Sequence, residues 1–388
     1  MRHENSLMSG LLKFIPWPAF ERLVDKYGSD RNTRTLSTKN QFVTLLHAQL
    51  CGHDSLRAVT TTMSSHADRL YHLGFRQPPQ RSTLADANAK RPAALYGELF
   101  GCLLGQLNRG QRRRFGCPVH LLDSTTVPLH ALSKIWSPDK KRDGAAGKLH
   151  VMFDLDGGVP VHFDVSSVRV NDIAFAKAML PASGTTYVFD MGYYDFSLWA
   201  KLDTENCRFV TRLKSHTKPQ IVAHREIVQD SSSATVIIAD RVIALTHRMK
   251  GNRQNPLEQT RLREVVIEIE TGKRLRLVTN DLDATAAIIA DLYKARWQIE
   301  LFFKWTKQNL PVRRFLGANE NAVRTQLGIA MIAFVLLKLA HAAQQSVPRL
   351  LDFTRLIATH LMTNRRFDQL TKPPPKCSID AQHEMQLC

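Results

Sequence analysis

The sequence predicts an α/β fold with a strand-rich centre between two helical regions. Three observations support this expectation. Up to about residue 112, apolar side chains recur at helical spacing, and Gly28, Gly52 and Gly74 divide the region into several short helices. From about residue 113 to 280, short apolar or alternating runs between turn residues are typical of strands. Helical spacing returns near Asp283 and continues to about residue 362.

The helical region 1–112 is interpreted as an N-terminal DNA-binding domain. Thr38-x-x-Gln41 has the pattern of a capping box at the start of a helix. Arginines such as Arg31, Arg57 and Arg69 are spread over the region, and their guanidinium groups suit a polyanion. A plain helical accessory domain that does not touch DNA is the alternative.

The order of the elements after residue 113 indicates the topology of the central sheet. Three predicted strands are followed by a helix, a fourth strand and a further helix. The strands are residues 119–122, 148–154, 159–165 and 186–189, and the first helix is 171–180. This is the order of the ribonuclease-H-like fold, in which the first and fourth strands lie side by side. Asp123 and Asp190, which follow those two strands directly, are then expected to meet.

Residues 206–280 are expected to form a β subdomain inserted into this core. The runs that predict its strands are 208–213, 234–238, 241–246, 264–270 and 274–279. The core resumes with the helix that begins near Asp283, so the ribonuclease-H-like domain is placed at 113–345. Residues 346–388 are expected to form a helical C-terminal segment and a tail, in which 372–376 is rich in proline.

The charge balance indicates a polyanionic partner. The 388 residues include 53 Lys and Arg against 35 Asp and Glu, a formal charge of +18. Basic clusters recur at 109–114, 140–142, 261–276, 294–314 and 365–366. Because the charge is not confined to one tail, a long binding track on nucleic acid is favoured.

No segment of the sequence indicates secretion or a membrane span. The N-terminus lacks the apolar stretch of a signal peptide. The longest apolar run, 329–339, is too short to cross a bilayer and is expected to be a buried helix. The six cysteines show no spacing typical of a zinc site, so we expect reduced thiols in a cytoplasmic protein.

One carboxylate lies among basic side chains on a predicted helix near residue 300. At about 3.6 residues per turn, Tyr293, Arg296, Glu300 and Lys307 fall within an arc of about 60°, with apolar residues gathered on a neighbouring arc. The charged row therefore borders a groove or a site. Phosphate suits Arg296 and Lys307, and a divalent metal suits Glu300. Lys304 shares this face and is a further candidate for phosphate contact.

Three acids in different parts of the chain are candidate metal ligands. Asp123 and Asp190 end predicted buried strands, and Glu300 lies on the basic helix. Buried carboxylates are unfavourable unless a cation or hydrogen bonds compensate them. A pair of Mg²⁺ ions would do so, because Asp and Glu oxygens are the hard ligands that this ion prefers. Such a pair catalyses in-line phosphoryl transfer.

The spacing Tyr293-x2-Arg296-x3-Glu300-x6-Lys307 resembles the signature of the insertion-sequence-four family of bacterial DDE transposases. Two further segments, Asp123-Ser-Thr-Thr and Phe189-Asp190-Met-Gly-Tyr193, resemble the first and second acidic motifs of that family. The resemblance spans about residues 115–340. The N-terminal segments 15–17 and 41–46 are similar to the N-terminal domain of many members.

The resemblance implies a cut-and-paste DNA transposase. Asp123, Asp190 and Glu300 would be the catalytic metal ligands for Mg²⁺, with Mn²⁺ as a substitute. Tyr293, Arg296 and Lys307 would hold DNA phosphates near the cleavage site. The implied partners are double-stranded DNA at the terminal inverted repeats and at the target. Because two DNA ends are joined in synapsis, a dimer is expected in that complex.

Hairpin formation on the transposon end is less firmly implied than cleavage. Family members that make hairpins often stack a flipped base on a Trp in the β insertion, and no Trp lies between Trp199 and Trp297 here. Phe209 or His247 is the candidate substitute, since stacking requires only a flat aromatic face. Trp297 itself is expected to pack against the protein.

Other acids and other functions remain as alternatives. Asp154, Asp156 and Asp195 are rival acids that turn chemistry explains adequately. Lys148 and His150 are possible DNA contacts. A ribonuclease-H-like nuclease that cuts without joining, and an inactive DNA-binding protein derived from a transposon, are the two rival functions.

Overall fold

The computed structural model describes residues 6–107, 113–139, 144–227, 235–246, 254–312 and 314–371. Its N-terminal part is helical, as expected. The helices are α1 (Leu7–Leu12), α2 (Trp17–Tyr27), α3 (Thr38–Cys51), α4 (Leu56–Ser65), α5 (Ala67–Leu70), η1 (Tyr71–Leu73), α6 (Arg81–Lys90) and α7 (Ala94–Leu107). The cap of α3 lies one residue before the predicted box: the Ser37 side chain accepts a hydrogen bond from the Asn40 backbone N–H.

The centre of the molecule is a mixed sheet with the ribonuclease-H-like strand order. Its core strands are β1 (Val119–Pro128), β3 (Gly144–Asp154), β4 (Val159–Ser167), β5 (Thr186–Phe189) and β6 (Arg208–Arg212). They are arranged β4-β3-β1-β5-β6. β3 is antiparallel to β1, whereas β5 is parallel to β1 and β6 is parallel to β5. The predicted neighbourhood of the first and fourth strands is therefore confirmed.

Short elements and helices connect these strands. β1 is followed by η2 (Ala131–Ile135) and β2 (Pro138–Asp139), β4 by α8 (Asp172–Ala178), and β5 by η3 (Met191–Tyr193) and α9 (Phe196–Thr204). β1 is longer than predicted, so Asp123 lies inside the strand and not at its end. Its chain continues because residues 124–128 still pair with β3, although the pairing with β5 stops at Leu122.

The inserted β region extends the same sheet. Its strands β7 (Gln220–His224), β8 (Val236–Ala244), β9 (Leu262–Glu268) and β10 (Arg274–Thr279) are antiparallel, and β10 pairs with β6. Residues 208–213, expected in the insertion, form the fifth core strand instead. The two runs predicted around 236 and 243 form one strand, β8, whose register shifts between Ile237 and Ala239. β7 was not predicted.

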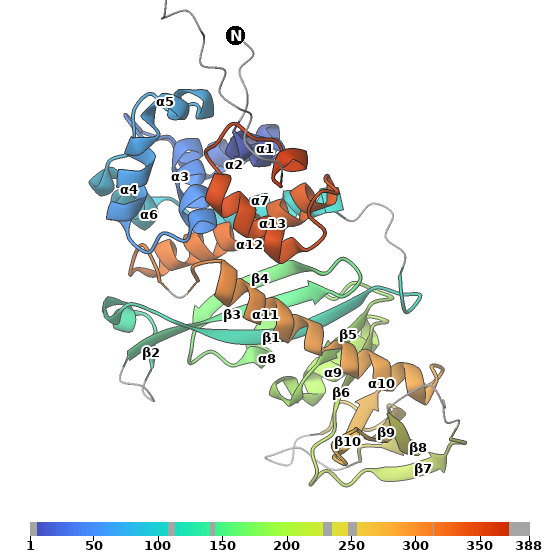
Figure 1. Cartoon of the computed structure of the whole chain (residues 1–388). Helices are drawn as coiled ribbons and strands as arrows, with labels where there is room; N and C mark the ends of the chain where they lie inside the picture. The colour runs from blue at the N-terminus through green and yellow to red at the C-terminus, as the bar shows by residue number, and fades with distance from the viewer. Residues whose placement is uncertain are drawn as a thin grey trace, which may run out of the picture.

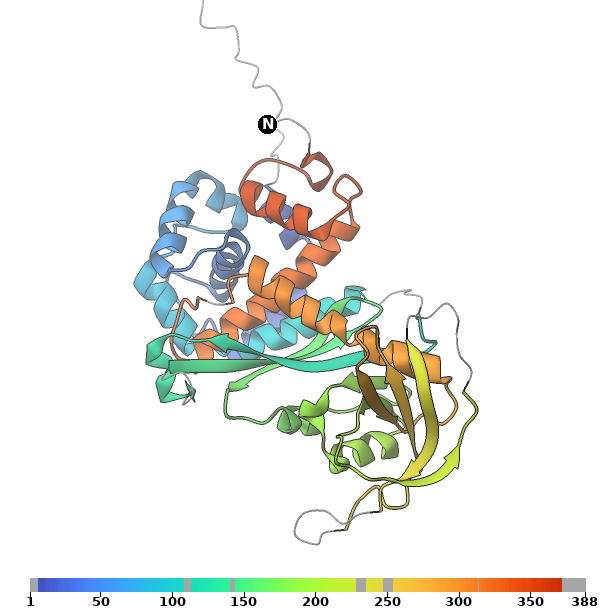
Figure 2. The same ribbon diagram turned by 60° about the horizontal axis from the view of Figure 1, so that its bottom comes forward.

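Helices from the C-terminal third cover one face of the sheet (Figure 1). They are α10 (Ala286–Ala295), α11 (Trp297–Asn309) and α12 (Glu320–Ala342), followed by α13 (Leu350–His360) and η4 (Phe367–Gln369). The helix predicted around residue 300 is divided at Arg296 into α10 and α11. α12 packs against α3 and α7, so the N-terminal and C-terminal helices share one body above the sheet (Figure 2).

The two faces of the sheet contribute to different hydrophobic cores because side chains alternate along a strand. Leu121 and Val151 lie in the core formed with the N-terminal helices, α11 and α12. Leu122 packs on the opposite face with α8 and α9 side chains. Among the described residues α12 alone is long and apolar enough to span a membrane, but 83% of its apolar window is buried inside the protein. The predicted buried helix at 329–339 is part of it.

Candidate catalytic site

The register between β1 and β5 brings two of the predicted acids together. Leu122 is the partner of Phe189 in this parallel pair, so Asp123 and Asp190 follow at the same level of the sheet. Neighbouring strands are about 4.8 Å apart. Asp190 is held by the turn that follows β5, where its Oδ1 accepts a hydrogen bond of 2.7 Å from the Gly192 N–H. A Cβ at Gly192 would lie 2.9 Å from this oxygen, so glycine allows the turn to close.

The third predicted acid comes from α11, which packs over β1. Glu300 Oε1 forms an ion pair of 2.6 Å with Arg296 Nη2. Two turns further along α11, the Lys307 ammonium donates a hydrogen bond to Thr125 Oγ1. Thr125 and Asp123 lie on the same face of β1, because they are two residues apart. This contact seats α11 over the part of β1 that carries Asp123.

The pKa of Asp123 depends on its burial and on the charges of the other two acids. Burial is the largest cause that raises the pKa of this carboxyl, to about 7, and the negative charges of Asp190 and Glu300 raise it further. The Ser124 N–H and Arg296 act in the opposite direction. Carboxylates that destabilise each other in this way are suited to a shared cation.

Basic and phenolic groups surround the acids, as the helical face predicted. Burial acts to lower the pKa of Arg296, but Tyr293 and Glu300 outweigh it and raise that pKa. Burial raises the pKa of the Tyr293 hydroxyl, which also interacts with Arg296, Arg212 and Asp190. Arg212 comes from the end of β6, so the site draws on the fifth strand as well. Tyr293 is only 9% exposed.

Two residues that sequence reasoning missed lie beside the acids. Asp172, at the start of α8, accepts hydrogen bonds from Ser124 Oγ at 2.8 Å and from Lys148 Nζ at 3.1 Å. The Tyr193 hydroxyl is buried, and within the described residues it has no hydrogen-bond partner. Burial raises its pKa well above the ordinary value, and the charges of Asp123, Asp172 and Asp190 add to this. The one sequence signal for Asp172 was the Asn171-Asp172 start of a helix.

Two of the three rival acids, Asp195 and Asp154, have the local structural roles that turn chemistry predicted, whereas Asp156 contacts a distant segment. Asp195 caps α9 through the Leu198 N–H, and Asp154 accepts a hydrogen bond from the Gly157 N–H. Asp156 accepts one from the Arg114 N–H. His150 is fully buried and is hydrogen-bonded to Ser166, so it has a core position and not the DNA contact that was considered as a possibility. Lys148 is bound to Asp172.

Two predictions about aromatic residues are wrong. Phe209 is fully buried between Phe189 and Trp199, so it has no face for a base. Trp297, expected to pack, is 57% exposed at the start of α11. Lys304 is exposed on the same helix. His247 lies outside the described residues, as do 140–142 and 372–376.

Comparison with known proteins identifies the family. The model described as "Transposase DDE domain" matches residues 115–336, more than half of the chain, and a domain of unknown function (DUF4372) matches 3–76. The chain is 37% identical to a putative transposase, y4zB, of Sinorhizobium fredii over 310 residues, covering 80% of this chain and 84% of that protein.

More distant relatives carry similar descriptions. A probable transposase for insertion sequence element IS5377 of Geobacillus stearothermophilus is 28% identical, over 66% of each chain. A putative transposase for insertion sequence element IS4SA of Synechocystis is 26% identical, over 71% of this chain and 76% of that protein. The solved piggyBac transposase synaptic complex with hairpin DNA has a TM-score of 0.48 at 12% identity, covering 97% of this chain and 84% of that chain.

The fold and the family match together define a ribonuclease-H-like enzyme that acts on DNA. The chain belongs to the bacterial DDE transposase family and is a DNA transposase. The family expected from the Tyr293 to Lys307 spacing is therefore confirmed.

Proposed function

We propose that Asp123, Asp190 and Glu300 are the catalytic residues and hold Mg²⁺ at the point where β1, β5 and α11 meet. The observation that carries this proposal is geometric: Asp123 and Asp190 follow paired residues of β1 and β5, and α11, which carries Glu300, packs over β1. Their oxygen donors match the preference of Mg²⁺, with Mn²⁺ as a substitute. When bound, the ions supply an activated attacking oxygen and stabilise the leaving oxygen.

The chain's own residues bind and orient the DNA strand. Arg296 has five N–H donors, enough to keep its ion pair with Glu300 and to bind a phosphate. Lys307, seated by Thr125, and the exposed Lys304 add positive charge along the same helix. Tyr293 lies beneath Arg296, whose guanidinium is 5.7 Å from the ring centroid, and it orients that group.

The proposed reaction is cleavage at the terminal inverted repeats followed by strand transfer into target DNA. Two ends must be held together for this, so we infer a dimer of the protein in the synaptic complex. Its DNA substrate implies action in the bacterial cytoplasm. Trp297, exposed beside Arg296, offers an aromatic face on which a displaced base can stack.

The test is Mg²⁺-dependent nicking of a duplex that contains the end of the element. Glu300→Gln keeps the size of the side chain and removes its charge, so we expect nicking to be lost. Glu258→Gln, at an exposed position in the inserted β region, is the matched control and should nick normally. Equal activity of the Glu300 variant and the wild type would refute the assignment.

Strand transfer is tested separately with pre-cleaved ends. The wild type should join their 3′ hydroxyls to a target duplex, whereas a nuclease without transfer activity would not. The mass of the complex formed with end DNA should correspond to two copies of the chain. One copy per complex would contradict the proposed dimer.

A further inference from the structure

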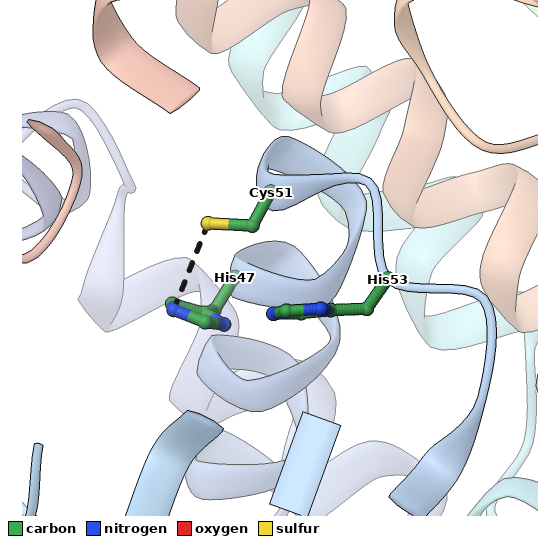
Figure 3. Close-up of side chains that lie close together, drawn as sticks. All are labelled: His47, Cys51 and His53. Carbon is green, nitrogen blue, oxygen red and sulfur yellow. Dashed lines mark hydrogen bonds between the residues drawn. The ribbon is translucent and has the colours of Figure 1, made fainter. Parts of the chain in front are cut away.

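Three side chains of the types that bind metals lie close together at the C-terminal end of α3 (Figure 3). His47 and Cys51 are one helical turn apart, and His53 follows immediately after Gly52. The left-handed backbone at Gly52 (φ +74°) turns the chain so that His53 comes back beside the helix. One donor atom from each residue lies within 4.8 Å of the other two.

This closeness is particular to the trio. No other set of three His, Cys, Asp or Glu residues among the described ranges meets the same distance condition, and the three catalytic acids do not. His47 Nε2 lies 3.7 Å from Cys51 Sγ. The ring centroids of the two histidines are 5.4 Å apart, and their planes differ by 26°. In Figure 3 the two rings lie side by side next to the thiol.

Two of the polar atoms in the cluster have no hydrogen-bond partner within the described residues. They are His47 Nδ1 and His53 Nε2, both buried. His47 as a whole is 1% exposed. An unpartnered buried polar atom costs about 1–3 kcal/mol. Bound metal would use one nitrogen of each imidazole as a ligand and so offset part of this cost.

We propose that His47, Cys51 and His53 bind a Zn²⁺ ion. Thiolate sulfur and imidazole nitrogen are the donors that zinc prefers, at about 2.3 Å and 2.0–2.1 Å, so binding requires the three side chains to adjust around the ion. Cys51 and His53 are partly exposed, so a water molecule has access to the fourth tetrahedral position. Mg²⁺ prefers oxygen ligands and does not compete for this site.

Zinc binds the thiolate form of cysteine and the neutral form of histidine. Formation of the zinc–sulfur bond therefore breaks the S–H bond of Cys51, and the proton is released to solvent.

The site would join α3 to the turn that follows it. His47 and Cys51 belong to α3, and His53 begins the turn that leads to α4. The Cys51 thiol donates a hydrogen bond of 3.9 Å to the Ala358 carbonyl oxygen of α13, and loss of the thiol proton to zinc would end this hydrogen bond. The linear pattern His-x3-Cys-x-His differs from the usual zinc spacings, which is why the sequence predicted no zinc site.

Cobalt provides a direct test, because a thiolate bound to Co²⁺ gives a charge-transfer absorption that oxygen ligands do not give. The full chain is stripped with a chelator and titrated with Co²⁺ in excess Mg²⁺, which occupies the acidic site. We expect the band to saturate at one equivalent and to disappear when Zn²⁺ is added. Cys51→Ser should abolish it, and His53→Gln should weaken Co²⁺ binding at least about 10-fold.

Cys102→Ser is the matched control, because Cys102 is an exposed free cysteine, and it should keep the band. Circular dichroism establishes that each variant is folded. Absence of the band in folded wild-type protein, or its persistence in Cys51→Ser, would overturn the proposal. Neither result would affect the assignment of the acids, which depends on nicking and not on this absorption.

Discussion

The raised pKa of Asp123 leads to a quantitative prediction for the stability of the metal-free protein. The folded-state pKa is about 7, against an ordinary value of 3.8, and burial is the main cause. The folded protein therefore binds this proton more tightly than the unfolded chain does. Stability is highest where the carboxyl is protonated in both states, and it falls as the pH rises from about 4 to about 7.

The magnitude follows from the size of the shift. At about 1.36 kcal/mol per unit, the ionised carboxylate destabilises the fold by up to about 4 kcal/mol above pH 7. At about pH 5 the same relation gives about 2 kcal/mol. Asp123→Asn has nearly the shape of the protonated acid and carries no charge, so it removes this penalty. We expect the variant to be more stable than the wild type by these amounts.

The assay is denaturant unfolding of both proteins in EDTA at several pH values. Every other titrating group is common to the two proteins, so the difference in their free energies of unfolding isolates Asp123. Adding Mg²⁺ should stabilise the wild type, by about 2.7 kcal/mol at 100 times Kd, and should stabilise the variant less. A difference that does not change between about pH 5 and pH 8 would refute the raised pKa of Asp123.

Three further predictions follow from single contacts. Lys307→Ala should weaken DNA binding for all sequences and reduce the magnitude of the slope of log K against log salt by about 1. Lys294→Ala, at an exposed position on α10, is the control. An unchanged slope in Lys307→Ala would exclude a phosphate contact. Trp297→Ala should weaken binding of single-stranded end DNA by about 1–3 kcal/mol in a fluorescence titration if a base stacks on it, and equal affinity would remove that role. Asp240→Ala should lower the free energy of unfolding by about 3–5 kcal/mol, because it leaves Arg263 buried without its 2.6 Å partner; replacing both residues with apolar ones should restore most of the loss.

Much of the fold is encoded in local patterns that can be read without the structure. Hydrophobic periodicity distinguishes strands from helices, because a strand alternates its faces and a helix repeats every 3.6 residues. The order of these elements indicated that the strands before Asp123 and Asp190 are neighbours, and the β1–β5 pairing agrees. The spacing from Tyr293 to Lys307 predicted the face on which Glu300 lies.

Other features depend on where chain segments meet, and local patterns do not contain that information. The composition of the strand Arg208–Arg212 does not distinguish a core strand from a strand of the insertion. Its parallel pairing with β5 shows that it belongs to the core. Trp297 lies on a predicted helix, but only the packing of that helix on its neighbours shows that the Trp297 side chain is exposed. Asp172 reaches the site by accepting a hydrogen bond from Ser124, which lies on β1, 48 residues earlier in the sequence.

The amino-acid sequence alone thus determined the class of fold and the family, and it predicted the three acids, because alternation, spacing and element order are properties of the chain. The tertiary structure decided the burial of those acids and the charges that surround them. The pKa of Asp123 depends on burial and on charges contributed by Asp190 and Glu300, and the trio His47, Cys51 and His53 forms only where Gly52 reverses the chain. Electrostatic and coordination effects act through space over a few ångströms, so only the folded arrangement fixes them.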